Sequence, residues 1–307
     1  SVNESGNSGS QYWPFFLLIL ALFFLSILLK NGLNQLKSRY FVEKMLIFSG
    51  ILAGWYFLHF LFQVPTQLFQ SQLFSPLLYA LYNHHINLGN LVIWSWILLL
   101  ITIYYVKNKP QKSAKLLSAV LYVIILFTVY YAIVFLIRSF VFDSQIVLNL
   151  YELATLNLNS FLVLGVVFIL LLCWLLLAYR WLGQLKSLSH SNHVFWGFSA
   201  VSFFAPFLFL QANQLVNWIV ILSFNGVIIL IYFVQRSNKN QRLLWEALAY
   251  LTIVSLSISL YINNLNDVRE KQNRETAALK LNLINDPFLE EHFISNIAKI
   301  QKDEDLL

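Results

Sequence analysis

The sequence predicts an all-α polytopic membrane protein with about eight transmembrane helices and a C-terminal extracytoplasmic helical stalk. Hydrophobic residues make up 59% of the 307 residues and charged residues only 11%, unlike a globular domain. The apolar residues gather in eight stretches of about 18–21 residues, the length that a helix needs to cross a hydrocarbon core of about 30 Å. These predicted spans are 12–29, 45–63, 87–106, 118–137, 159–179, 194–211, 214–234 and 243–262.

The distribution of Lys and Arg predicts the orientation of these spans. The loops after spans two, four and six contain a single base, Arg138, whereas the loops after spans one, three, five and seven hold most of the 20 bases. Cytoplasmic loops carry an excess of Lys and Arg, so both ends of the chain are predicted to lie outside the cytoplasm. The inner bases are Lys30, Lys37, Arg39, Lys44, Lys107, Lys109, Lys112, Lys115, Arg180, Lys186, Arg236, Lys239 and Arg242.

The net charge of +6 points to a membrane surface as the partner. The basic residues stand at the ends of apolar helices, where they meet anionic phospholipid headgroups. We therefore expect a phospholipid membrane as partner and no nucleic acid.

Residues 1–11 form the first element, a predicted extracytoplasmic linker. They are polar, with one acid, Glu4, and no base, unlike a secretory signal peptide. We expect the chain to be part of a longer protein. Residues 12–262 form the eight-span domain, in which spans six and seven make a tight hairpin and Pro206 kinks span six.

The two long outer loops, 64–86 and 138–158, are unusually apolar. The first contains Pro76 and no Lys, Arg, Asp or Glu, and the second contains Asp143 and Ser144. Such loops are expected either to lie in the headgroup region as short amphipathic helices or to re-enter the helix bundle.

The composition changes after Ile262, and residues 263–307 are expected to begin a further domain. Residues 263–284 keep helical spacing and predict a stalk that continues the last span. Asp286 is a good N-cap residue and Pro287 suits the first helical position, so a second helix is expected there. Its apolar face needs a partner, which would be the rest of that domain.

Motifs for catalysis, cofactors and metals are missing from the sequence. It has no glycine-rich phosphate loop, no zinc-spaced set of Cys and His, and no helical metalloprotease motif. We therefore predict no catalytic residue, no cofactor and no metal in this segment. His84-His85 is a weak metal or pH signal, since adjacency alone is a poor ligand pattern.

Two residues lie within predicted spans and could be polar or reactive, Glu246 and Cys173. Glu246, near the inner end of span eight, either pairs with Arg242 at the interface or forms a proton or ligand site. Cys173 lies in the middle of span five and is expected to be a small buried hydrophobe.

Three stretches resemble the membrane sensory region of large multi-span bacterial sensor histidine kinases of two-component systems. Asn87 and Asn90 stand where that family would place a serine and an acid. The stretches are Leu73 to Ala80 with Asn87 to Leu91, then Phe142-Asp143-Ser144 with Asn159-Ser160, and finally Ala277 to Leu281 with Asp286-Pro287-Phe288-Leu289-Glu290.

This resemblance implies a signal-transducing module in the bacterial inner (cytoplasmic) membrane. Its partners would be the sensor and kinase domains of its own chain, with the kinase core outside this segment, and we expect a homodimer. The candidate structural or signalling residues are Pro76, Gly89, Asp143, Ser144, Glu246, Asp286, Pro287 and Glu290.

The sequence leaves other classes open. A small-solute transporter or permease is compatible with eight spans and a kinked span six, although mid-membrane charge and inverted repeats are not evident. The evidence for a membrane-bound lipid or glycan transferase is weaker still. Such enzymes usually group acids or histidines at one interface, and Asp143, Glu152 and His84-His85 are too few and too scattered to form such a group.

Overall fold

The computed structural model describes ten segments of the chain. They are residues 13–35, 40–62, 72–75, 78–80, 86–108, 116–146, 148, 156–185, 222–232 and 243–283. The chain consists of two compact units, Ser1–Asn264 and Leu265–Leu307.

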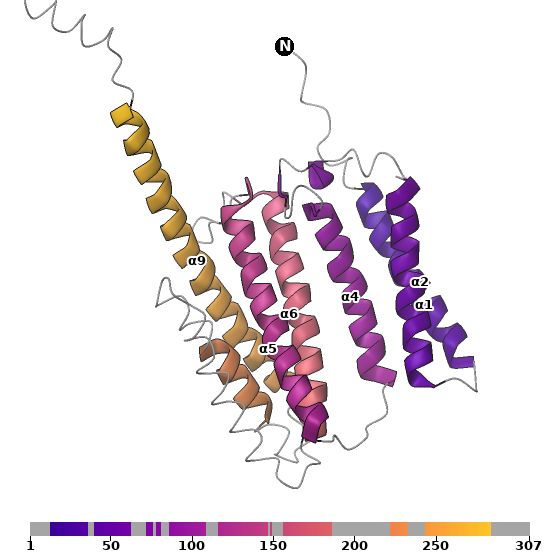
Figure 1. The fold of residues 1–307 in the computed structure, drawn as a ribbon. Coiled ribbons are helices and arrows are strands. Elements are labelled where there is room, and N and C mark those ends of the chain that lie inside the picture. Colours follow the sequence, from indigo (N-terminus) through magenta and orange to yellow (C-terminus); the bar gives the residue numbers. More distant parts are fainter. Residues whose placement is uncertain are drawn as a thin grey trace, which may run out of the picture. The chain divides into compact units, whose positions relative to one another are not determined.

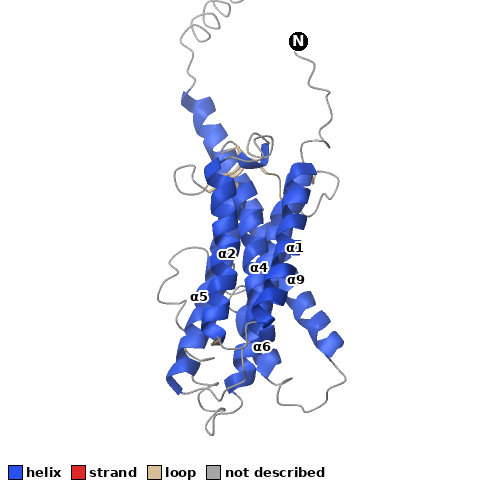
Figure 2. Cartoon of the chain, turned by 90° about the vertical axis from the view of Figure 1, so that its right-hand side faces the viewer, coloured by secondary structure: helices blue, strands red, loops and turns tan. Residues whose placement is uncertain are grey.

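The described residues are helical apart from short connecting segments, so the all-α class is confirmed (Figures 1 and 2). An isolated antiparallel bridge joins Tyr79 and Ser144. The helices are α1 (Trp13–Gln35), α2 (Phe41–Phe62), the 3-10 helix η2 (Gln72–Phe74), α4 (Leu88–Asn108), α5 (Leu116–Phe142), α6 (Leu158–Leu185), the short helix Leu222–Tyr232 and α9 (Leu243–Leu283).

Among the described residues, five helices are long and apolar enough to cross a membrane, which makes the chain a membrane protein in character. They lie at Trp13–Gln35, Phe41–Phe62, Leu88–Asn108, Leu121–Phe142 and Leu158–Gln184, which correspond to predicted spans one to five. Span six lies outside the described residues, span seven is described only over Leu222–Tyr232, and span eight falls within α9. The total of eight therefore stays a prediction.

The ends of the helices differ from the predicted bounds. α5 continues to Phe142, so Arg138 lies in a helix and not in a loop. The reason is packing, because Phe140 and Val141 are buried and prolong the apolar face of α5. α9, in contrast, runs from Leu243 to Leu283 without a break, which is the helical continuation past Ile262 that the spacing of residues 263–284 predicts.

Helices α4 and α6 lie at the centre of the first unit. α4 packs against α6, α1 and α2, and α5 packs against α6. α2 buries only Phe48 and Leu52, and the Phe48 ring stacks on Tyr104 of α4 with centroids 4.3 Å apart. The exposed apolar side chains of α1 and α2 would face lipid in a membrane, because the hydrocarbon core of a bilayer contains no water.

An aromatic cluster joins α5, α6 and the helix Leu222–Tyr232. Trp174 is fully buried, and its indole N–H donates to the Leu126 carbonyl at 2.9 Å. The Tyr130 and Ser223 hydroxyls are 2.6 Å apart, and the Phe224 ring lies 5.1 Å from Tyr130. Interhelical hydrogen bonds and close packing are what hold helices together in lipid. Cys173, next to Trp174, is buried and unbridged, as expected.

In the second unit, the described residues are those of α9 from Leu265 onward. Side chains 271–280 are all exposed, and Arg274 pairs with Glu270 one turn before it. This part is therefore a solvated helix, as the composition change after Ile262 predicts. Asp286, Pro287 and Glu290 lie outside the described residues.

Candidate functional site

Two segments far apart in the sequence meet at the end of the helices where α4 and α6 begin and α5 ends (Figure 1). Residues 78–80 run antiparallel to residues 143–146. Tyr79 bridges Ser144, and the Gln145 backbone N–H donates to the Leu78 carbonyl at 3.2 Å. The name polar cap is used for two groups of residues that bond or pack at this end of the helices: Tyr79, Ser139, Asp143 and Ser144, and Tyr56, Phe74, Asn87, Gly89 and Asn90.

A chain of three polar groups runs through the polar cap from the interior to the surface. Tyr79 is fully buried and Ser139 nearly so, while Asp143 is exposed. The Ser139 hydroxyl donates to Asp143 Oδ2 at 2.8 Å. The Tyr79 hydroxyl lies 3.1 Å from Ser139 Oγ. A serine has one hydroxyl proton, so with that proton directed at Asp143, Tyr79 is the donor to Ser139.

Electrostatics keep the Tyr79 phenol protonated. Burial raises the pKa of Tyr79, the hydrogen bond with Ser139 lowers it, and the nearby Asp143 carboxylate raises it further. The net shift is upward, because a phenolate would be both poorly solvated and close to a negative charge. The phenol therefore remains a hydrogen-bond donor at neutral pH.

The last turn of α5 sets up this geometry locally. Ser139 and Asp143 are four residues apart, the spacing that places two side chains on one face of a helix. The Asp143 backbone N–H also donates to the Ser139 carbonyl at 2.8 Å. Ser144 ends the helix: its hydroxyl donates to the Phe140 carbonyl and accepts from the Ile146 N–H at 3.2 Å.

Asn87 fixes the other side of the polar cap. Its Oδ1 accepts from the Asn90 N–H at 3.0 Å, which is the bond of a helix N-cap. Its Nδ2 donates to the Phe74 carbonyl at 2.9 Å. The Phe74 ring lies over Gly89, so closely that a Cβ added there would be 2.7 Å from the ring. Gly89 is thus required because it lets η2 approach α4.

Asn90 connects α2 to the polar cap. It is buried, and its Oδ1 accepts a hydrogen bond from the Tyr56 hydroxyl of α2 at 2.7 Å. The start of α6 repeats the N-cap, since Asn157 Oδ1 accepts from the Ser160 N–H at 2.9 Å. The helix starts at this end are therefore fixed by asparagine caps in both α4 and α6.

Among the predicted residues, Asp143 and Ser144 lie beside Ser139 and Tyr79, and Gly89 lies against the Phe74 ring. Pro76 lies outside the described residues, as do Asp286, Pro287 and Glu290, and the side chain of Glu246 is not described. Of the apolar loop 64–86, the described part packs on the bundle: Leu73 and Phe74 are buried and η2 contacts α4.

Sequence reasoning did not single out Tyr79, Ser139 or Tyr56. Ser139 could have been found from its four-residue spacing to Asp143, which places the two side chains on one face of a helix. For Asn87, an available signal was its place just before an apolar helix. Neither Tyr79 nor Tyr56 had a local signal, because their partners are 60 and 34 residues away.

The described part of the chain contains no group of three or more His, Cys, Asp or Glu side chains that could hold a metal ion. His59 lies beside Trp55, with ring centroids 4.1 Å apart, and His84-His85 is outside the described residues. What the polar cap offers is a hydrogen-bonded link between an exposed carboxylate and a buried phenol.

Comparison of the chain with protein-family models, with curated proteins and with solved structures gives no match.

Proposed function

We propose that this chain is the membrane sensory module of a bacterial two-component sensor histidine kinase, with the kinase core in another part of the protein. One observation supports this most: the first two of the three stretches that carry the resemblance meet in space. Residues 73–74 and 78–80, 87–91 and 142–144 all lie in or beside the polar cap.

In this proposal the polar cap is the part that receives the stimulus. It lies on the predicted extracytoplasmic side and combines an exposed carboxylate with buried hydroxyl groups. A change at Asp143 alters the bonds of Ser139 and Tyr79, and through them the fit of residues 78–80 against α5. Packed helices then shift between discrete arrangements.

α9 is the proposed output element. Its continuous helix from Leu243 to Leu283 can transmit a translation or a rotation as one rigid element. The residues after it would enter the extracytoplasmic sensor domain. We expect the module to act as a homodimer in the inner membrane, with both ends of this chain outside the cytoplasm.

Autophosphorylation of the intact protein in membrane vesicles tests the proposal. Inserting one alanine after Asn266 rotates everything beyond it by about 100°, whereas inserting seven alanines changes the phase by only about 20°. We expect the single insertion to change the kinase response and the seven-residue insertion to preserve it. Equal responses from both would contradict rigid transmission.

A second measurement separates the function classes. Saturable uptake of a small solute into proteoliposomes, without any ATP-dependent phosphorylation of the intact protein, would favour a permease and overturn the proposal. Phosphorylation on histidine without solute flux is the expected result.

A further inference from the structure

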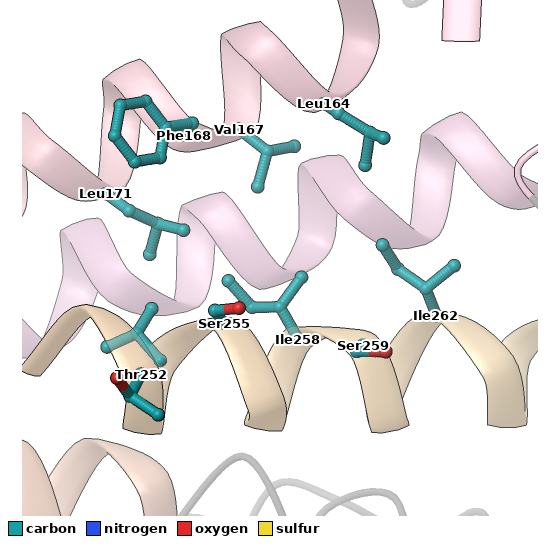
Figure 3. Close-up of a pocket in the computed structure, with 10 residues that line it drawn as sticks. Leu164, Val167, Phe168, Leu171, Thr252, Ser255, Ile258, Ser259 and Ile262 are labelled. Atoms are coloured by element: carbon teal, nitrogen blue, oxygen red, sulfur yellow. The ribbon is translucent and has the colours of Figure 1, made fainter. Parts of the chain in front are cut away.

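A groove lies between α6 and α9 in the first unit, with a volume of about 630 Å³. Figure 3 shows apolar side chains of α6, among them Val167 and Leu171, directed toward α9 across it. From α9, Ser255, Ile258 and Ser259 line the opposite wall. The volume lies within the range of about 300–1,000 Å³ that is typical of ligand sites. Ligand sites also typically have apolar walls with a few polar groups, as this groove does.

The two serines of the groove, Ser255 and Ser259, differ from several other hydroxyl residues of the described helices. Ser257, on the same helix, donates to the Ile253 carbonyl one turn earlier at 2.7 Å. Ser49 and Thr128 bond to their own helices in the same way. Ser255 and Ser259 make no hydrogen bond among the described residues, so their hydroxyls remain able to donate into the groove.

The dimensions of the groove favour a slender occupant. A helix about 10 Å across takes up roughly 420 Å³ for each turn of 5.4 Å. A membrane span of about 20 residues is about 30 Å long and would need several times the volume of the groove. A single extended hydrocarbon chain fits such a space, and hydrocarbon is the solvent around these helices.

The depth of Ser259 favours a lipid with a carbonyl group near the interface. Ser259 is three residues before Ile262, the predicted outer end of span eight, which is about 4.5 Å along a helix. The ester groups of phospholipids lie at that boundary. A carbonyl oxygen accepts a hydrogen bond from a serine hydroxyl.

We propose that the groove between α6 and α9 binds one fatty acyl chain of a membrane phospholipid, whose ester carbonyl accepts a hydrogen bond from Ser259. The chain lies along Leu164, Phe168 and Ile258. This lipid site does not depend on the proposed signalling function, since it follows from the groove and its hydroxyls alone.

Photolabelling of the full chain in phosphatidylcholine vesicles tests the site. The vesicles contain a small fraction of phosphatidylcholine with a diazirine in its acyl chain, and mass spectrometry locates the labelled residues. We expect labelling of 164–171 and 252–262 to exceed, several-fold, the labelling of exposed residues on α1 such as Phe24 and Leu28. Uniform labelling of all exposed apolar faces would overturn the proposal.

Two matched pairs of variants sharpen this test. Ser259→Phe fills the groove and should abolish the excess labelling, while Leu256→Phe, at an exposed neighbouring position, should preserve it. An ether-linked probe lacks the carbonyl, so the ester probe should label about fivefold more, the ratio that one ordinary hydrogen bond provides. Ser259→Ala should remove that preference and Ser257→Ala should not.

Other occupants give distinct outcomes. If the segment 194–221 fills the groove, α6 and α9 will show no excess labelling in the wild type, and the proposal is wrong. If a second copy covers it, labelling will rise when the protein is diluted in lipid, which would also contradict a resident acyl chain.

Discussion

Gly89 illustrates how a single missing Cβ shapes the polar cap. The Phe74 ring occupies the space that a side chain would need, 2.7 Å from the position of an added Cβ. Gly89→Ala should lower the free energy of unfolding by about 1–3 kcal/mol, the usual cost of overpacking. Thermal unfolding in detergent measures this effect.

Gly165→Ala in α6 is the control for Gly89→Ala. No atom lies within 4 Å of a Cβ added at Gly165, and alanine favours a helix over glycine by about 0.5–1 kcal/mol. This control should leave stability unchanged or raise it. Equal effects at the two positions would show that the Phe74 contact is unimportant.

Tyr79 makes a pH-dependent contribution to stability. Its pKa is raised by burial from the ordinary value of 10.0, so the folded state holds the proton more tightly than the unfolded state. The resulting stabilisation is complete below pH 10 and is lost as the pH rises through the folded pKa. In Tyr79→Phe, the free energy of unfolding should therefore fall less steeply with rising alkaline pH than it does in the wild type.

The measurement for Tyr79→Phe is thermal unfolding between about pH 8 and pH 11, around the ordinary pKa of tyrosine. At neutral pH the variant should be about 1 kcal/mol less stable, because it loses the hydrogen bond to Ser139. Tyr40→Phe, at a side chain that is 80% exposed, is the comparison. An alkaline profile identical to that of the wild type would contradict the assignment.

At the scale of elements, the asparagine caps of α4 and α6 perform different tasks. Asn157 uses only its oxygen, toward the N–H and the hydroxyl of Ser160. Asn87 uses its oxygen on Asn90 and its nitrogen on the Phe74 carbonyl. The cap of α4 thus also holds η2 in place.

Aspartate substitutions distinguish these two caps. Asn157→Asp keeps the acceptor and should be close to neutral. Asn87→Asp keeps the cap but replaces the donor to the Phe74 carbonyl with a carboxylate oxygen, and should cost about 1–3 kcal/mol, because a hydrogen bond is replaced by two oxygens that face each other. Comparing the thermal unfolding of the two variants tests this, and a larger loss at Asn157 would contradict it.

The helices themselves are predictable from sequence more readily than their ends. α1, α2, α4, α5 and α6 are long apolar runs, and such runs have few alternatives in a membrane. The end of α5 is not predictable, because Phe140 is buried by a contact with Tyr79, 4.7 Å between ring centroids. The same holds for the candidate site. Asp143 and Ser144 could be picked out from the sequence, but the pairing of residues 78–80 with 143–146 could not, because it is a contact between segments far apart in the chain.

At the scale of the whole molecule, the charge distribution predicts which ends of the helices face the cytoplasm. Single cysteines at described, exposed positions test this in a Cys173→Ala background. With a membrane-impermeant thiol reagent on intact cells, we expect labelling at Gln145→Cys and Thr276→Cys and none at Tyr40→Cys. Labelling at position 40 with protection at 145 would show the opposite orientation.

The hydrogen bonds from Tyr79 through Ser139 to Asp143 have a polarity. Both hydroxyl protons point toward the carboxylate, so the two O–H dipoles add along one line. Each hydroxyl carries one proton, so the direction of one bond fixes the direction of the next. The line keeps this direction as long as Ser139 donates to Asp143. The two dipoles therefore lie one behind the other between an exposed carboxylate and a phenol that has no contact with solvent.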